Sequence, residues 1–245
     1  MSAFPEAALD WLAVWSGVRG LTVGKDPSLP KRLARRDHKV FALAPDESLY
    51  ERFAAYDGVL PLRADPTAIP TDPFQFEVVF CHQDFHHLDA VQVLPQVARV
   101  LRPGGCFSLS YLIRDDSVPW VRRLAALLRR YDPMAMRGDY GHQSLDAVKE
   151  SDYFPEVEER AFRIWQTMSR DAMAEMVRRQ PLTQRMSEDQ VDRLVEEVLD
   201  LYDSAARPGE ELKLPFQLLC LRAWVDHAEL SRPVRLPDTG LEIKV

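Results

Sequence analysis

Short apolar runs alternate along the chain with segments whose apolar residues recur at helical spacing. Apolar runs of strand length, bounded by glycine, proline or aspartate, predict strands, and a spacing of three or four predicts helices. The strands are expected at residues 21–23, 39–44, 58–62, 78–81, 106–111, 162–167 and 212–225. The helices are expected at residues 5–15, 29–36, 47–56, 119–130, 170–179 and 187–204, with one more ending near residue 100.

Local signals refine two of these boundaries and leave one region open. Ser187 and Gln190 have the spacing of a capping box, so they are expected to begin the last long helix. The glycines at 104 and 105 are expected to end the helix before them. Residues 131–144 mix proline, methionine, glycine and aromatic residues without a clear period and are predicted to be irregular.

The alternation of strands and helices predicts a doubly wound α/β sheet. Its central unit is the strand at 78–81, a polar loop with His82, His86 and His87, a helix, and the strand at 106–111. That order is typical of a right-handed crossover between parallel strands. Ligands of such sheets lie beyond the carboxyl ends of the strands, which is where the histidine loop is expected.

Composition narrows the classes of partner and compartment. The net charge of -7 over 245 residues argues against nucleic acid or an anionic membrane as the main partner. Cys81, Cys106 and Cys220 are far apart in apolar runs and are predicted to be buried free thiols in a reducing compartment. No apolar run has membrane-spanning length and no signal-peptide pattern opens the chain, so a cytoplasmic protein is predicted.

Four motifs together carry a family resemblance. The most specific is Val-Leu-Arg-Pro-Gly-Gly at 100–105, and the others are Glu-Val-Val at 77–79 followed by Phe-His-His-Leu-Asp at 85–89, Asp-Pro-Thr-Ala-Ile-Pro at 65–70, and Arg-Asp-Asp-Ser-Val-Pro-Trp at 114–120. With them the chain resembles the class I methyltransferases that use S-adenosylmethionine, in particular small-molecule members of the methyltransferase 11 type.

The resemblance implies a fold and a domain organisation. The fold expected is Rossmann-like, a seven-stranded and mostly parallel sheet with an antiparallel C-terminal strand and helices on both faces. Residues 1–245 are expected to form a single methyltransferase-like domain. Its cofactor half is expected at about 1–112 and its acceptor half at about 113–245.

The resemblance also implies a site. His86 or His82 is the candidate general base, because an imidazole can deprotonate a hydroxyl or phenol acceptor. The candidate cofactor contacts are Val23, Gly24, Lys25, Asp46, Asp65, Pro66, His82 and Gln83. The candidate substrate contacts are Arg114, Trp120, Tyr111 and Tyr140.

The sequence departs from the family pattern in the cofactor half. The loop after the first strand keeps only Gly24, lacks the family's acidic residue, and is stiffened by Pro27. Ala44 stands where the family has the carboxylate that accepts both ribose hydroxyls, and its loss costs about 1.5–3 kcal/mol per hydrogen bond. Only three residues precede Phe4, so the segment that covers the cofactor is expected to be absent or short. Weakened binding of S-adenosylmethionine is therefore expected.

Two functions stay open at this point. One is methyl transfer from S-adenosylmethionine to a small molecule, and the other is a non-catalytic protein that binds a metabolite or a protein partner. His86 and His87 have an alternative interpretation as residues that begin a helix and pack there. Cysteine, histidine and aspartate crowd residues 81–89, but their spacing matches no zinc pattern, and no metal is predicted.

Overall fold

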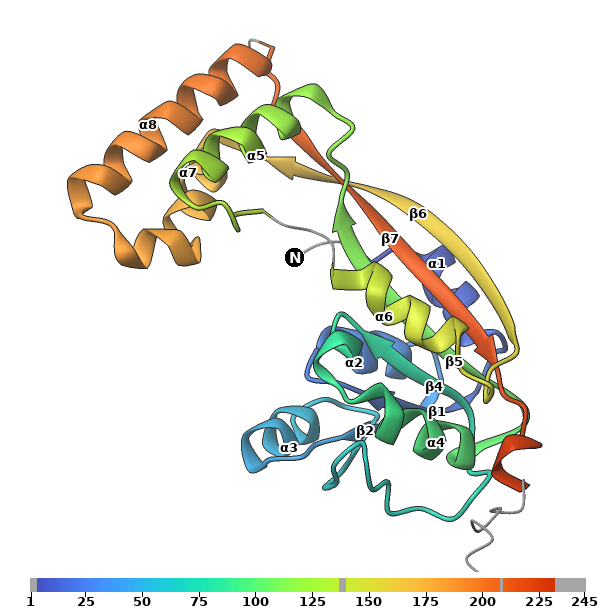
Figure 1. The fold of residues 1–245 in the computed structure, drawn as a ribbon. Coiled ribbons are helices and arrows are strands. Elements are labelled where there is room, and N and C mark those ends of the chain that lie inside the picture. Colours follow the sequence, from blue (N-terminus) through green and yellow to red (C-terminus); the bar gives the residue numbers. More distant parts are fainter. Residues whose placement is uncertain (1–3, 137–139, 208, 232–245) are drawn as a thin grey trace, which may run out of the picture.

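The computed structural model describes residues 4–136, 140–207 and 209–231, with the side chains of 140–144 outside the description. One sheet of seven strands crosses the molecule in the order β3-β2-β1-β4-β5-β7-β6 (Figure 1). The strands are β1 (Arg19–Val23), β2 (Lys39–Leu43), β3 (Val59–Leu62), β4 (Phe76–His82), β5 (Leu101–Arg114), β6 (Glu156–Met168) and β7 (Leu212–Trp224).

Strand directions follow the predicted class. The pairs β1·β2, β2·β3, β1·β4 and β4·β5 are parallel, whereas β7 is antiparallel to both β5 and β6. Only β7 therefore runs against the other six strands. The prediction of a mostly parallel, Rossmann-like sheet with an antiparallel C-terminal strand is confirmed.

Helices cover both faces of the sheet because neighbouring strand residues point to opposite sides. The helices are α1 (Glu6–Ala13), α2 (Ser28–Ala34), α3 (Glu47–Ala54), α4 (Ala90–Val100), α5 (Pro119–Tyr131), α6 (Tyr140–Lys149), α7 (Arg170–Arg178) and α8 (Glu188–Ala205). Val79 and Cys81 pack with α4 and α6, whereas Val78 and Phe80 pack with α1 and α2. Alternate residues of β4 thus belong to two separate apolar clusters.

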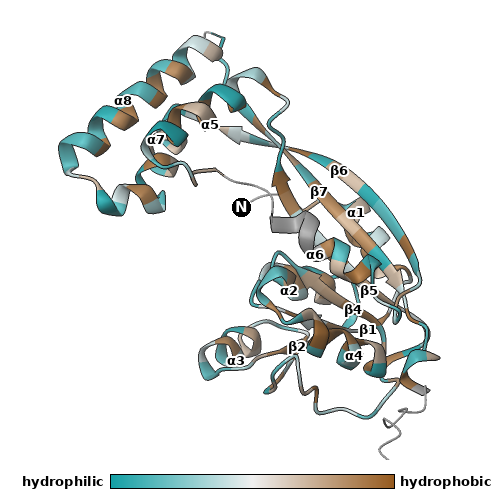
Figure 2. Cartoon of the chain, in the orientation of Figure 1, coloured by the Kyte–Doolittle hydropathy of each residue, from teal (hydrophilic) through white to brown (hydrophobic). Residues whose placement is uncertain are grey.

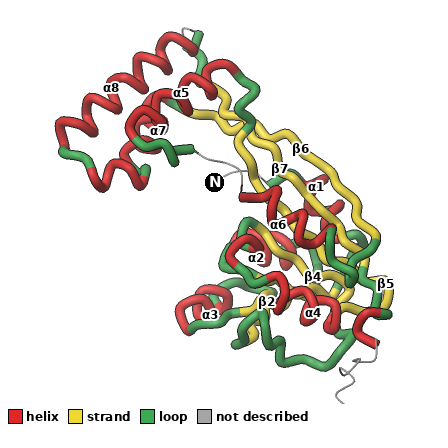
Figure 3. Tube along the Cα trace, in the orientation of Figure 1, coloured by secondary structure: helices red, strands yellow, loops and turns green. Residues whose placement is uncertain are grey.

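A third apolar cluster lies at the far end of the long strands. It is formed by α5, α7 and α8 with the first residues of β7, and Leu124, Val198 and Leu214 are among its members. Figure 3 shows these helices grouped at one end, joined to the rest of the chain by β5, β6 and β7. The three strands are 14, 13 and 13 residues long, so they extend through both groups of helices.

The edge strand β6 differs from the central strands in polarity. Figure 2 shows hydrophobic residues along the central strands and hydrophilic ones along much of β6. Glu158, Glu159 and Arg160 lie on β6, and most of its residues are exposed or half-buried. Charges on an edge strand discourage pairing with another chain.

Two local predictions are wrong. Residues 140–149 form α6, so the irregular region predicted at 131–144 is helical from Tyr140 on, while 137–139 lie outside the described residues. The glycines at 104 and 105 do not end a helix: α4 stops at Val100 and they lie inside β5. Gly105 is needed there because a Cβ would come within 3.0 Å of the Glu77 carbonyl oxygen on the neighbouring strand.

Other local predictions are confirmed. Ser187 and Gln190 form the capping box that begins α8, with both reciprocal hydrogen bonds present. Cys81, Cys106 and Cys220 are buried free thiols. Within the described part of the chain, no helix combines the length and the apolar character needed to cross a bilayer.

Candidate functional site

The carboxyl ends of the parallel strands meet at one edge of the sheet, which we call the carboxyl edge. Val23 is the register partner of Cys81, and His82 is the partner of Ser110. Gly24, which follows β1, and Gln83, which follows β4, therefore both lie at this edge. The predicted histidine loop lies here, at the position where such sheets bind ligands.

An aspartate ties the loop after β1 to the loop after β4. The Asp84 carboxylate accepts hydrogen bonds from the backbone N–H groups of Lys25, at 2.5 Å, and Asp26, at 3.0 Å. Gly24 has φ +117°, and a Cβ at this residue would lie 2.8 Å from Asp84 Oδ2. The two loops are thus in direct contact, and the amides exposed by the turn at Gly24 already have an acceptor.

His82 ends β4 with its side chain almost fully buried. Its Nδ1 lies 2.8 Å from Ser110 Oγ, and its ring meets that of Phe4 edge to face at 5.3 Å between centroids. Burial lowers the pKa of His82 from its ordinary value of 6.5, and the nearby Asp26 carboxylate acts in the opposite direction. The ring borders a small cavity of about 140 Å³ that Leu112 and Leu218 also line. A neutral imidazole in this place is able to accept a proton.

Gln83 holds a backbone conformation that is rare for residues other than glycine. Its φ is +62°, its N–H donates to the Ser110 carbonyl, and its side-chain amide donates to the Leu112 carbonyl at 3.4 Å. These bonds keep the turn against β5. Strained residues of this kind cluster at functional sites, where the surrounding structure maintains them.

The second candidate base lies on the other side of the sheet end. His86 belongs to a single 3₁₀ turn, Phe85–His87, and its ring lies tilted at 43° to that of His87, with 3.8 Å between the ring centroids. Its backbone N–H donates to the Tyr111 hydroxyl, and Tyr111 belongs to the cluster covered by α4 and α6. Burial and the neighbouring His87 lower the pKa of His86. His82 packs with the opposite cluster, so the structure does not bring the two histidines together.

The ends of β2 and β3 carry the remaining cofactor candidates. Ala44 is fully buried and packs against α3. Asp46 caps α3 by accepting from the Leu49 N–H at 2.9 Å, and Asp65 Oδ1 accepts from both the N–H and the hydroxyl of Thr67. Hydrogen bonds to Thr67 lower the pKa of the exposed Asp65 carboxyl group. Each of these two carboxylates already stabilises a local turn.

The other four cofactor candidates differ in how far they are exposed to solvent. Val23 and Pro66 are buried, Gly24 is half-buried, and Lys25 is exposed. Of this group, only Lys25 presents a side chain to solvent.

The substrate candidates are mostly committed to internal contacts. Arg114 forms a two-point ion pair with Asp116 and donates to the Met136 carbonyl at 2.8 Å. Trp120 packs partly buried in the cluster of α5, α7 and α8, and Tyr111 is only 2% exposed. Tyr140 begins α6, but its side chain lies outside the described residues.

Sequence reasoning missed the residues that organise the edge. Asp84 counted only as one of several possible metal ligands, and Ser110 was not considered. The available signal was the hydrogen-bonding need of a turn: backbone N–H groups at Gly24 require an acceptor, and an aspartate follows the facing strand. Within the described chain, no three histidine, cysteine, aspartate or glutamate side chains are arranged to hold a metal ion.

A sequence profile described as "Methyltransferase domain" matches residues 26–109. An uncharacterized methyltransferase of Mycobacterium tuberculosis is 35% identical over 130 residues, which cover 52% of this chain and 54% of the relative. The chain is a methyltransferase-family protein. The chain matches about half the length of these curated relatives.

Solved structures support the fold of this methyltransferase-family protein. A candidate type II methyltransferase from Anaeromyxobacter dehalogenans has a TM-score of 0.68 at 19% identity, covering 92% of this chain and 97% of the other. A candidate methyltransferase from an antibiotic biosynthesis pathway of Anabaena variabilis has a TM-score of 0.57 at 12% identity, covering 87% and 94%. At these identities the likeness concerns the fold. The profile match begins at Asp26, after β1 and Gly24.

Proposed function

We propose that this protein keeps the methyltransferase fold with a weakened site for S-adenosylmethionine, and that it acts by binding a metabolite or a protein partner. The observation that carries the proposal is the contact between Asp84 and the loop after β1. Asp84 occupies two backbone amides of that loop and lies against Gly24. A ligand that needs the same amides has to displace a carboxylate hydrogen bond, which costs about 1.5–3 kcal/mol.

The end of β2 supports the same conclusion. A ribose is held in such sites by a carboxylate that accepts from its hydroxyls, and this chain has the methyl group of a fully buried alanine, Ala44. Asp46, two residues later, is the N-cap of α3. Moving its side chain toward a ribose would leave the Leu49 N–H without its hydrogen-bond acceptor. The residues present therefore do not fit S-adenosylmethionine in the way that the family resemblance implies.

Calorimetric titration of the full chain with S-adenosylmethionine and S-adenosylhomocysteine tests the proposal. We expect no heat of binding at micromolar ligand and none that saturates at about 1 mM. A micromolar dissociation constant for either compound would overturn the proposal, whichever acceptor is present. Ala44→Asp is the matched variant: a gain in affinity would identify the missing carboxylate as the cause.

A second function, methyl transfer to a small molecule, is favoured by one observation. His82 borders a cavity and is hydrogen-bonded through Nδ1, and because burial lowers its pKa the ring is neutral at neutral pH, which is the form that a general base needs. In that case His82 accepts the proton of a hydroxyl or phenol acceptor. Production of S-adenosylhomocysteine by wild-type protein, lost in His82→Gln, would establish this function. Lack of turnover with a broad acceptor panel would argue against it.

The same proposal includes the cellular setting. Three buried free thiols support a reducing compartment, and the net charge of -7 supports a partner other than nucleic acid. We propose a cytoplasmic protein. Fractionation of cells that express the full chain tests this, and recovery from a membrane or secreted fraction would contradict it.

A further inference from the structure

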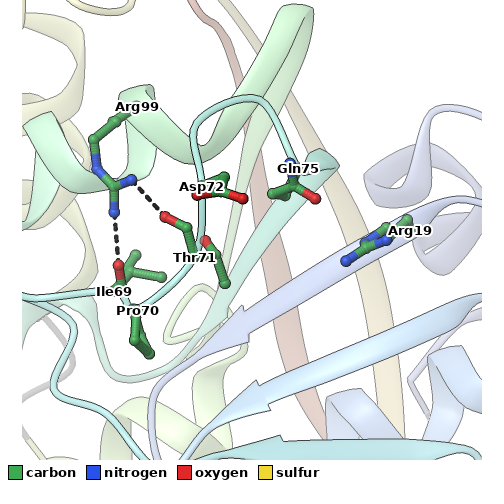
Figure 4. Close-up of a pocket in the computed structure, with 7 residues that line it drawn as sticks. All are labelled: Arg19, Ile69, Pro70, Thr71, Asp72, Gln75 and Arg99. Atoms are coloured by element: carbon green, nitrogen blue, oxygen red, sulfur yellow. Dashed lines mark hydrogen bonds between the residues drawn. The ribbon is translucent and has the colours of Figure 1, made fainter.

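A second cavity lies at the opposite edge of the sheet, where the parallel strands begin. We call it the amino-edge cavity, and its volume is about 510 Å³. Arg19 from the start of β1, Arg99 from the end of α4, and the loop from Ile69 to Gln75 line it (Figure 4). Cavities of roughly 300–1,000 Å³ are typical of small-molecule sites. This cavity is separate from the carboxyl edge, where the candidate residues Gly24, His82 and Gln83 lie.

Two buried polar atoms in this lining have no protein partner. Among the described residues, Arg19 Nε and Thr71 Oγ1 are buried side-chain atoms without a hydrogen bond. A buried donor left unpaired costs free energy, and such groups are rare in folded proteins. The two residues that carry these atoms line the same cavity, so a molecule bound there would be able to give each atom a hydrogen-bond partner.

The guanidinium group of Arg19 is held in place for this role. Its Cζ lies 4.8 Å from the centroid of the Phe41 ring and 5.6 Å from that of Phe76. Contact with two aromatic faces fixes the plane of the group and excludes water from that side. Figure 4 shows Arg19 on one wall of the cavity, with the loop that bears Thr71 and Gln75 across from it. The donor is therefore oriented before any ligand arrives, which lowers the entropy cost of binding.

The opposite wall is equally rigid because Arg99 fixes it. Its Nη1 donates to the Thr71 carbonyl at 2.7 Å, and its Nη2 donates to the Ile69 carbonyl at 2.6 Å. The N–H groups of Phe74 and Gln75 return hydrogen bonds to the Arg99 and Val100 carbonyls. Arg99 thus sets the position of Thr71. Its own guanidinium group donates to uncharged oxygens, those of Ile69, Thr71 and Gln96, which do not neutralise its positive charge.

The charge of the lining selects the ligand. Within the described chain, neither Arg19 nor Arg99 forms an ion pair. Two guanidinium groups and one carboxylate, Asp72, leave the lining with a net positive charge. The Nε–H of an arginine, with the adjacent Nη–H, matches the spacing of two oxygens in a carboxylate or phosphate group.

We infer that the amino-edge cavity binds a small organic oxyanion, a carboxylate or a phosphate ester. One oxygen accepts from Arg19 Nε–H, and the Thr71 hydroxyl donates to the same ligand. Asp72 disfavours multiply charged ligands and leaves room for one with a hydroxyl or amino group of its own. This site is independent of S-adenosylmethionine and stands whether or not the proposed function holds.

The test uses the full chain, with inorganic phosphate and succinate as separate probes in calorimetric titrations at low ionic strength. We expect one of them to bind with a dissociation constant at or below about 1 mM. Binding of phosphate alone identifies a phosphate ester as the natural ligand, and binding of succinate alone identifies a carboxylate. No binding of either probe up to about 10 mM overturns the inference.

Variants then locate the site. Arg19→Gln is expected to weaken binding about tenfold or more, because a charge-assisted hydrogen bond is lost. Arg160→Gln is the matched control: Arg160 lies over the Phe162 ring at 4.9 Å on β6, away from the cavity. It removes the same charge and should change binding by less than about twofold. Equal losses in the two variants would reveal a general charge effect and overturn the site.

Two further variants keep the test decisive if Arg19→Gln does not fold. Arg19→Lys keeps the charge but has no Nε–H, and Thr71→Val keeps the shape but has no hydroxyl. Both are expected to weaken binding, Arg19→Lys about tenfold and Thr71→Val several-fold. Wild-type affinity in both variants would exclude recognition by these two groups.

Discussion

The two edges of the sheet differ in how their polar groups are satisfied. At the carboxyl edge, Asp84 holds the amides after Gly24, and His82 is bonded to Ser110. At the amino edge, Arg19 Nε and Thr71 Oγ1 are buried without partners beside a cavity of about 510 Å³. The amides after Gly24 and the His82 ring, at the edge where the fold places ligands, already have protein partners, whereas Arg19 Nε and Thr71 Oγ1 at the opposite edge do not.

The difference shows that a site's place in the fold does not by itself give it free polar groups with which to bind a ligand. Strand topology places the carboxyl edge where α/β proteins bind ligands, but a ligand also needs groups that gain from its arrival. A site whose donors and acceptors already bond one another offers little differential free energy. Substitutions at the two edges measure how firmly the carboxyl edge is closed and how much free energy the unpaired groups of the amino edge cost.

The largest effect is expected from Gly24→Ala. The backbone at Gly24 has φ +117°, and the added Cβ would lie 2.9 Å from Asp84 Cβ, so strain and steric overlap act together. We expect the free energy of unfolding to fall by about 3 kcal/mol, measured by urea denaturation. Gly104→Ala is the control, because Gly104 has φ +73° with open space around it and should lose only about 1 kcal/mol. Equal losses would mean that the two loops are not in close contact.

Asp84→Ala is expected to have the next largest effect. It removes the acceptor of the Lys25 and Asp26 N–H groups, and the free energy of unfolding should fall by about 2 kcal/mol. Asp46→Ala, which removes one N-cap hydrogen bond at a comparable loop, should cost about 1 kcal/mol. If Asp84→Ala were no more destabilising than Asp46→Ala, Asp84 would not be what closes the carboxyl edge.

A smaller effect, with opposite signs at two hydroxyls, distinguishes the edges. Thr71→Val removes a buried hydroxyl that has no partner, so ligand-free protein should gain up to about 1 kcal/mol in unfolding free energy. Ser108→Ala removes a buried hydroxyl that donates to the Leu12 carbonyl at 2.7 Å and should lose about 1 kcal/mol. Thermal denaturation of the two variants beside wild type measures both. A loss for Thr71→Val equal to that for Ser108→Ala would show that Thr71 has a partner.

The mildest effect concerns pH and His82. Burial holds the pKa of His82 below its ordinary value of 6.5, so the folded state favours the neutral ring. Its contribution to stability is complete above pH 6.5 and is lost as pH falls toward the lowered pKa, because the unfolded chain then binds the proton first. In His82→Asn the unfolding free energy should therefore fall less than in wild type between neutral pH and about pH 5. Parallel pH curves for the two proteins would contradict this.

Much of the candidate site could be predicted at the level of strand ends. The runs that end near Val23 and Cys81 placed Gly24 and His82 at one edge, since parallel strands end together. The separation of His82 from His86 could not be predicted, because it depends on which face each side chain takes after the turn at Gln83. The helix at Tyr140–Lys149 was missed because its first turn lacks a clear apolar period.

The sequence by itself determined the class of this protein. Periodic apolar residues, the capping box at Ser187, and the Val-Leu-Arg-Pro-Gly-Gly motif at 100–105 are local signals, and they were enough for the Rossmann-like sheet. Only the tertiary structure decided which polar groups find partners. Asp84 and Lys25 are 59 positions apart, and Arg19 meets the Thr71 loop only because β1 begins beside it. Hydrogen bonding acts over about 3 Å in space, and strand order sets which distant residues come that close.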